Sequence, residues 1–268
     1  MLESVKVDTH THSVLSGHAW STLRENAAAA ARRGMEALCL TEHGHSIPGA
    51  GPFFLASAQK MLPERIEGIR MFYGVEANIM DFKGGLDIDD KSLFGLEFVI
   101  ASLHDLCLQP GTPRENTEAY LGSLRHPCVD VIGHMDDRRT PSEFATVIRE
   151  AGRLGKLIEI NNNSLLIRKG GRERVEEVAR ICAEFGVGVT VASDAHFDEM
   201  IGAVGPSLEL LDRIGFPDQL VVNRDLATFA EYLAAREARV EEAWAESFAA
   251  TGSIRLKGRR APRGGPTA

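Results

Sequence analysis

Seven short apolar runs recur along this chain, and each ends in residues that can bind a divalent metal. Histidine nitrogens and carboxylate oxygens bind such metals at about 2.0–2.2 Å, so ligands at the ends of separate parallel strands can converge without relying on flexible loops. The pattern therefore predicts a metalloenzyme. The runs are VKVDTHTH, ALCLTEHGH, MFYGVEAN, FVIASLH, VDVIGH, LIEINNN and VTVASDAH.

Segments with helical spacing, such as SEFATVIREAGRLG and GRERVEEVARICAEFG, separate the apolar runs. Repeated strand–helix units build parallel sheets through right-handed crossovers, and seven of them favour closure into a barrel with helices outside. An open sheet would instead gather its site at one switch point. We therefore predict an α/β fold, a distorted (β/α)7 TIM-like barrel with the metal site at the C-terminal ends of the strands.

The length of 268 residues suffices for one large domain. We expect this domain to span residues 1–250, with an eighth apolar run, QLVVN at 219–223, leading into a C-terminal helix or helix pair. Residues 251–268 mix basic residues with glycine and proline, which predicts a flexible basic tail. The tail could contact nucleic acid, but a solvated terminus is the preferred interpretation.

The composition limits which classes of partner the protein can bind. The net charge of -8 argues against a surface that coats nucleic acid, although a short nucleic-acid substrate stays open. No window is apolar over the length that a bilayer requires, and the first residues do not resemble a signal peptide, so we expect a cytoplasmic protein without membrane contact. The four cysteines lack the close spacing of a thiolate zinc site, and no GxSxG elbow offers a nucleophile.

His10 and His12 alternate with threonines, so on a strand their side chains point the same way and can bind one metal together. Asp8 points with them and could hold an imidazole from the second shell. Asp194 and His196 repeat the two-residue spacing at the seventh run. Unpaired polar groups at so many strand ends would cost about 1–3 kcal/mol each, so a purely structural role does not explain the set.

These motifs resemble the PHP (polymerase and histidinol phosphatase) family. VDTHTH, TEHG, GVEAN, SLH, IGH and SDAH follow one another in the family's order, and SGHAWSTL and EINNNSLLIRKG resemble the stand-alone YcdX-type phosphatases. The resemblance implies three divalent metal ions in one cleft, with zinc first and manganese or iron as alternatives. It places His10, His12, Glu76 and Asp194 on the first metal, Glu76 with His104 and His134 on the second, and His18, His43 and His196 on the third.

One motif departs from the family. Where the family commonly has TDH, this chain has Thr41, Glu42 and His43. The ligand His43 is kept, while Glu42 could support a ligand from the second shell, relay a proton or face water.

The resemblance implies a metal-dependent phosphatase that hydrolyses small phosphomonoesters through a metal-bridging hydroxide at a trinuclear site, with Asp194, Glu76 and His196 as catalytic residues. A phosphate also needs cationic donors. The loop after the sixth run supplies Arg168 and Lys169 beside Asn162, and we expect substrate contacts there. The alternative is that these cations are solvated while the asparagines serve the loop backbone. Arg138 and Arg139 are a second candidate pair.

Three other functions stay open at this point. Related domains process nucleic acid, so a nucleotide-end phosphoesterase or exonuclease is one. Histidinol phosphatase is another, although the SGHAWSTL and INNNS stretches lean away from it. A noncatalytic, metal-stabilised binding domain is the third, but such domains usually lose ligands and this chain keeps all of them. The sequence leaves the oligomeric state open.

Overall fold

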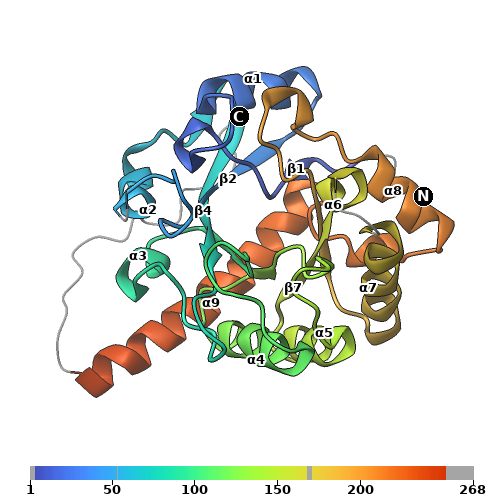
Figure 1. Cartoon of the computed structure of the whole chain (residues 1–268). Coiled ribbons are helices and arrows are strands. Elements are labelled where there is room, and N and C mark those ends of the chain that lie inside the picture. Colours follow the sequence, from blue (N-terminus) through green and yellow to red (C-terminus); the bar gives the residue numbers. More distant parts are fainter. Residues whose placement is uncertain (1–3, 53, 168–170, 252–268) are drawn as a thin grey trace.

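The chain folds around one curved parallel sheet, visible at the centre of Figure 1. This computed structural model describes residues 4–52, 54–167 and 171–251, with side chains described as far as residue 246. Seven strands pair in parallel in the order β1-β2-β4-β5-β6-β7-β8, and the short β3 pairs with β4 in the antiparallel sense. The strands are β1 (Val7–Asp8), β2 (Ala37–His43), β3 (Arg65–Ile66), β4 (Ile69–Asn78), β5 (Phe98–Ser102), β6 (Val131–Ile132), β7 (Leu157–Asn161) and β8 (Val189–Ala192).

Alternation along β2 shows how the sheet separates two cores. Ala37 and Cys39 belong to an apolar cluster inside the barrel, whereas Leu38 and Leu40 belong to the larger cluster between the strands and the outer helices. Side chains alternate between the faces of a strand, so the inner positions continue to His43 at the carboxyl end. The interior is therefore apolar at one end of the barrel and polar at the other.

Helices cover the outside of the sheet. Helices α4, α5 and α7 pack side by side along it in Figure 1, and α1 lies against β2. Thr22 and Thr112 begin α1 and α4 with capping boxes, in which the threonine and a glutamate three residues later satisfy the first free amides. The helices are α1 (Leu23–Arg32), α2 (Leu55–Ala58), α3 (Asp90–Phe94), α4 (Pro113–Leu124), α5 (Phe144–Arg153), α6 (Asn162–Ile167), α7 (Gly171–Phe185), α8 (Gly205–Arg213) and α9 (Leu226–Thr251), with 3-10 turns at Val14–Ser16, Gln59–Met61, Asp198–Met200 and Asp218–Leu220.

Two sets of contacts join β1 and β8, which do not pair with each other as regular strands. Thr11 forms an isolated parallel bridge with Ala195 beyond the strand ends. At the other end, the Asn223 side chain donates to the carbonyls of Val7 and Val191, at 2.7 Å each, and accepts from the Val191 amide at 3.0 Å. One amide side chain thus replaces the missing strand pairing. The sheet is nearly closed into a barrel, which confirms the predicted fold.

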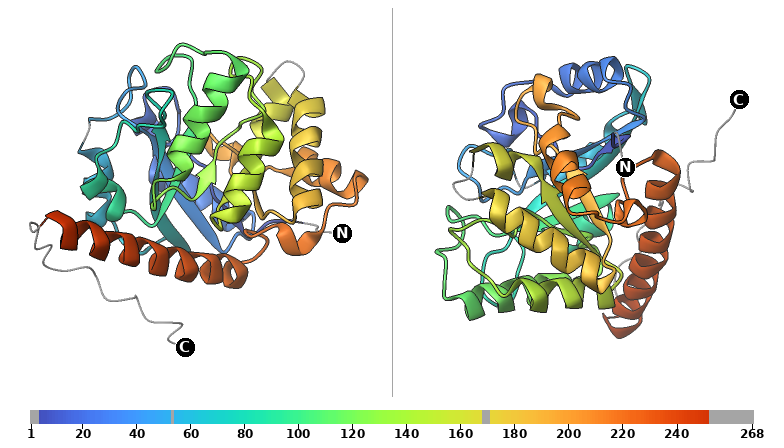
Figure 2. Two further views of the ribbon diagram at one scale, coloured as in Figure 1. Left: turned by 90° about the horizontal axis from the view of Figure 1, so that it is seen from below. Right: turned by 90° about the vertical axis from the view of Figure 1, so that its right-hand side faces the viewer.

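A single helix, α9, covers the N-terminal ends of the strands. The sequence predicted either one helix or a helix pair in this part of the chain. Figure 2 shows α9 running across one end of the barrel. Phe229 of α9 packs edge-on against Phe72 and Phe98 in the inner apolar cluster and so closes the end of the barrel that α9 covers. The eighth apolar run at 219–223 forms no strand, since only Val221 bridges Val189 there.

A buried ionic cluster fastens α9 to the strands. Asp130, which precedes β6, is fully buried and accepts hydrogen bonds from Arg236 at 3.1 Å and Arg239 at 2.9 Å. It also accepts from the Tyr232 hydroxyl at 3.2 Å and the Val99 amide at 2.9 Å. Both carboxylate oxygens are satisfied, as buried charges require.

The single-domain prediction for residues 1–250 stays a prediction, and the expected tail falls almost entirely outside the described residues. Within the described part of the chain, each helix is too short or too polar to cross a membrane. Three cysteines, Cys39, Cys128 and Cys182, are buried, and Cys107 is partly exposed.

Candidate metal centre

Glu76 lies at the centre of a cluster of histidines at the C-terminal ends of the strands. Its Oε1 lies 2.9 Å from Nε2 of His134 and 3.3 Å from Nε2 of His104. Its Oε2 lies 2.7 Å from Nδ1 of His43 and 3.3 Å from Nε2 of His10. The two oxygens of one carboxylate thus face two different sets of imidazoles, as a bridging ligand would.

His10 and His12, which follow β1, face the same space, as their spacing predicted. Their Nε2 atoms lie 3.6 and 3.4 Å from Oδ1 of Asp194. Asp194 comes from the loop after β8, and its other oxygen accepts from Nδ2 of Asn161 at 3.1 Å. Two strands at the barrel seam therefore supply one group of nitrogen and oxygen donors.

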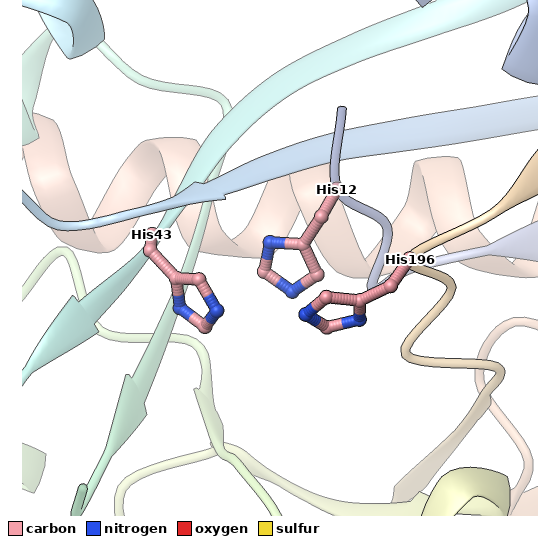
Figure 3. A group of neighbouring side chains, drawn as sticks. All are labelled: His12, His43 and His196. Atoms are coloured by element: carbon pink, nitrogen blue, oxygen red, sulfur yellow. The ribbon is translucent and has the colours of Figure 1, made fainter. Parts of the chain in front are cut away.

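Three histidines form the open side of the cluster. The Nε2 of His18 lies 3.3 Å from Nε2 of His43 and 3.0 Å from Nε2 of His196. Tetrahedral zinc with nitrogens at about 2.0–2.1 Å separates its ligands by about 3.3 Å, so these spacings fit one ion. Figure 3 shows His12, His43 and His196 turned toward a common space from three separate segments.

Glu159, on β7, orients His10. Its Oε1 lies 2.6 Å from Nδ1 of His10, and its Oε2 accepts from the His134 amide at 2.8 Å and from Nδ2 of Asn161 at 3.1 Å. A proton on Nδ1 shared with this carboxylate leaves Nε2 of His10 to face the cluster, which is how carboxylates commonly prepare metal-binding histidines. Glu159 was not among the residues predicted from the sequence, although a glutamate within a buried apolar strand is a signal that could have revealed it.

Glu42 reaches the cluster through Ser16. The Ser16 hydroxyl donates to Glu42, and Nδ1 of His12 lies 3.0 Å from the Ser16 oxygen. Because the hydroxyl hydrogen is used on Glu42, the His12 ring donates from Nδ1 and directs the lone pair of Nε2 toward the cluster. Of the roles left open for Glu42, second-shell support agrees with these contacts.

His104 is oriented by an amide in the same way. Its Nδ1 lies 2.6 Å from Oδ1 of Asn78. The amide nitrogen of Asn78 donates to Asp87 at 2.7 Å and to the Gly44 carbonyl at 3.2 Å, so the oxygen must face His104. Asn78 follows Glu76 by two residues on β4 and shares its face, a signal present in the motif GVEAN.

Several buried ligand atoms in the cluster have no aligned hydrogen-bond partner among the described residues. They are Nε2 of His10, Nε2 of His12, Nδ1 of His43, Nδ1 of His134 and Oε2 of Glu76. The 2.7 Å contact between His43 and Glu76 is short in distance but not aligned for hydrogen bonding. Buried polar atoms are rarely left unpaired, and imidazole and carboxylate donors at this spacing fit divalent metals.

The charges of the cluster are strongly coupled. Burial alone would lower the pKa of His10, but the carboxylates of Glu159, Glu76 and Asp194 raise it well above its usual value. Burial would raise the pKa of Glu76 and of Asp194, but the surrounding histidines hold both well below the usual range. Burial and neighbouring histidines lower the pKa of His12. The donors are thus largely prepared for a cation, and binding one would displace a proton from His10.

Unusual backbone geometry holds three of the candidate ligands. His134 and Asp194 have positive φ angles of 25° and 54°, a conformation that costs non-glycine residues energy and often marks functional sites. His18 follows Gly17, which has φ 82°, and a side chain on Gly17 would collide with the Gly49 carbonyl. This close approach of two loops places His18 over the cluster.

The contacts of Asp8 differ from the predicted contact with an imidazole. Its carboxylate accepts hydrogen bonds from the Ser193 amide and hydroxyl and from the Gly202 amide, so it fastens β1 to the loop after β8 instead of holding an imidazole. The reason is geometric, because regular strand pairing ends at Asp8 and the period-two alternation does not carry through to His10.

The structure says less about the predicted substrate-binding residues than about the predicted metal ligands. Arg168 and Lys169 lie outside the described residues. Asn162 donates to the Ala203 carbonyl and accepts from Ser207, which ties the start of α6 to the start of α8, and substrate contact by Asn162 stays a prediction. The alternative cation Arg139 binds two carboxylates, those of Asp105 and Asp137.

A family model for the PHP domain matches residues 8–165, which is more than half of the chain. The chain belongs to the PHP domain family. This confirms the predicted membership, and the matched region runs from β1 into α6, thereby including every candidate ligand except Asp194 and His196.

Relatives of this PHP protein extend beyond the matched region. A probable phosphatase of Acetivibrio thermocellus is 40% identical over 234 residues, covering 87% of this chain and 97% of the relative. A probable phosphatase of Clostridium botulinum is 40% identical over 227 residues, covering 85% and 93%. Both alignments therefore span nearly the whole relative.

Among solved structures, the PHP protein is similar in fold to a histidinol phosphate phosphatase of Lactococcus lactis complexed with zinc, L-histidinol and phosphate. The TM-score is 0.56, the identity 19%, and the alignment covers 79% of this chain and 94% of the other. A second similar structure, from Listeria monocytogenes, has a TM-score of 0.50 and 14% identity, with coverage of 76% and 99%. At this identity the likeness concerns the fold alone.

Proposed function

We propose that this PHP protein is a metal-dependent phosphatase that hydrolyses small phosphomonoesters at a site for three divalent ions. The observation that carries the proposal is the set of buried imidazole and carboxylate atoms that face one another around Glu76 without aligned hydrogen bonds. Relatives with 40% identity named probable phosphatases support the reaction class.

We assign the ions as the family resemblance implied. Glu76 would bridge a group of His10, His12 and Asp194 to a group of His104 and His134. His18, His43 and His196 would hold the third ion, for which zinc is the first expectation and manganese or iron are alternatives. The candidate groups share His12, His43 and Glu76, so they form one continuous cluster.

Bound divalent ions lower the pKa of a coordinated water and neutralise charge that develops on phosphoryl oxygens. The protein's own residues keep the ligands in place for this chemistry. Glu159 holds His10, Ser16 with Glu42 holds His12, and Asn78 holds His104, each through Nδ1. Positioning of this kind supplies much of the catalysis in phosphoryl transfer.

The other functions gain no comparable support. The nucleic-acid alternative drew on the basic tail, and residues 252–268 are outside the described part of the chain. A noncatalytic domain would have little use for a complete and carefully oriented donor set. Small phosphomonoesters are therefore the preferred substrate class.

The test is hydrolysis of a panel of phosphomonoesters by protein stripped of metal and then reloaded with zinc, manganese or iron. We expect turnover only in the reloaded protein, and loss of turnover in Asp194→Ala under every metal. Full hydrolysis by metal-depleted protein would contradict the proposal, as would an inactive reloaded protein with a measured content of three ions per chain.

A further inference from the structure

Trp20 and Phe197 expose large aromatic side chains beside the metal centre. The side chain of Trp20 is 79% exposed and that of Phe197 is 44% exposed. A large aromatic ring contributes most when it is buried, so two such rings left in water on neighbouring segments are a candidate contact surface for a ligand.

The two residues lie on adjacent segments. The Trp20 amide donates to the His196 carbonyl at 2.8 Å, and the Asp198 amide donates to the Ser21 hydroxyl at 2.8 Å. The first bond joins the two backbones and the second ends on a side chain, and together they hold the segment of Trp20 beside the segment of Phe197. Phe197 has the extended backbone angles φ -149° and ψ 145°.

This pair lies at the open side of the cluster. The side chains of His10 and His12 have no exposed surface, whereas that of His196 is 20% exposed and His18 is exposed. A substrate therefore approaches past His18 and His196. Trp20 follows His18 by two residues, and Phe197 follows His196 directly. Both aromatic residues therefore lie close in sequence to the two histidines at the open side of the cluster.

We propose that Trp20 and Phe197 determine substrate specificity by stacking against a flat aromatic ring in the organic part of the phosphomonoester. This inference rests on the proposed phosphatase function and deepens it. Val14 and Leu15, each 47% exposed on the same loop as Trp20, enlarge the apolar surface. An aromatic face stacks on any flat ring, so the surface selects a class of substrates and not one compound.

The test compares two esters of the same primary ribose hydroxyl, adenosine 5′-phosphate and methyl riboside 5-phosphate, which differ by the adenine ring. In the metal-loaded full chain, we expect kcat/KM to favour the adenine compound by about tenfold, in the range for stacking of one base. Trp20→Ala should bring this ratio close to one, mainly through KM, whereas Trp20→Phe should keep most of it. Met61→Ala is the matched control, because Met61 is 82% exposed and leads toward β3.

A second readout does not depend on turnover. The chain has two tryptophans, so Trp244→Phe leaves Trp20 as the sole indole emitter. We expect adenosine 5′-phosphate, and not the methyl riboside ester, to quench its fluorescence. Equal kcat/KM for both esters in the wild type, or an equal loss for both in Trp20→Ala, would overturn the inference while leaving the phosphatase proposal standing. Quenching without hydrolysis of either ester would support the aromatic site and count against the phosphatase.

Discussion

Both ends of the barrel bury charged side chains, but the hydrogen bonding of the central carboxylate differs between the two ends. At the end covered by α9, each oxygen of Asp130 accepts well-placed hydrogen bonds from arginine, tyrosine or backbone donors. At the opposite end, Oε2 of Glu76 lies among imidazoles without one aligned hydrogen bond in the described part of the chain. Both oxygens of Asp130 are satisfied by the protein's own donors, and Oε2 of Glu76 is not.

The difference separates a structural cluster from a ligand site. A buried ion pair with all partners in place is self-sufficient, and losing one partner leaves the other charge uncompensated. A cluster of donors whose lone pairs face one another is stable only with a cation between them. Both ends of the barrel contain buried charged residues, so burial and charge alone would mark both as candidate sites. The hydrogen bonding of the central carboxylate distinguishes them.

The largest expected effect comes from exchanging one carboxylate for an amide at each end. Asp130→Asn should lower the free energy of unfolding by about 3–5 kcal/mol, because Arg236 is then buried without a counter-charge. Glu76→Gln should destabilise metal-free protein less than Asp130→Asn does, because Oε2 has no hydrogen bond to lose and only its ionic interaction with the surrounding histidines is removed. Urea unfolding of metal-depleted protein measures both.

Activity should show the reverse order. Glu76→Gln should lose more than the roughly 10–100-fold that follows loss of an outer-shell partner, while Asp130→Asn should keep its turnover per folded molecule. Equal losses of stability and of activity in the two variants would remove the distinction between the two ends.

The next effect concerns the residues that orient the ligands. Glu159→Gln keeps an oxygen near Nδ1 of His10 but removes the negative charge, so metal affinity should fall by about 10–100-fold. Competition with a chromogenic chelator measures the affinity directly. Glu150→Gln is the control, because Glu150 pairs with Arg153 on α5, away from the cluster. Unchanged affinity in Glu159→Gln would reduce Glu159 to a structural residue of β7.

The smallest effect tests the α9 end by pH. Lys156 is buried near Arg239 and Arg236 and donates to the carbonyls of Leu124 and His126, and burial lowers its pKa from 10.5 to about 7. Above pH 7 the unfolded chain therefore binds a proton that the native protein does not, so stability rises with pH from about 7 to 10.5. Lys156→Met should remove this rise.

Buried thiols with raised pKa values act in the opposite direction at higher pH, so the useful quantity is the difference between wild type and variant. Between pH 7 and 8.5 this difference in unfolding free energy should grow by about 1.6 kcal/mol in favour of the wild type. Lys91→Met, on the short helix α3 at the surface, should leave the wild-type pH profile in place. A flat difference for Lys156→Met would mean that Lys156 stays protonated in the fold.

Much of the site could be predicted because metal ligands are few in kind and follow strand ends. The spacing paired His10 with His12, the family resemblance added Glu76 and Asp194 to the same metal, and the structure brings the four together. Asp8 was misjudged because its role depends on where strand pairing stops. Glu42 was left open because Ser16, the hydroxyl that links it to His12, carries no signal in a motif.

By itself, the sequence determined the family, the barrel and the set of candidate ligands, since alternating apolar runs and histidine spacing are local patterns that survive any packing detail. Only the tertiary structure decided which side chains orient those ligands, why both oxygens of Asp130 are satisfied while Oε2 of Glu76 is not, and that the segment of Trp20 lies beside that of Phe197. These facts depend on contacts between residues up to 177 positions apart, and such contacts are set by how the strands close, not by any local pattern.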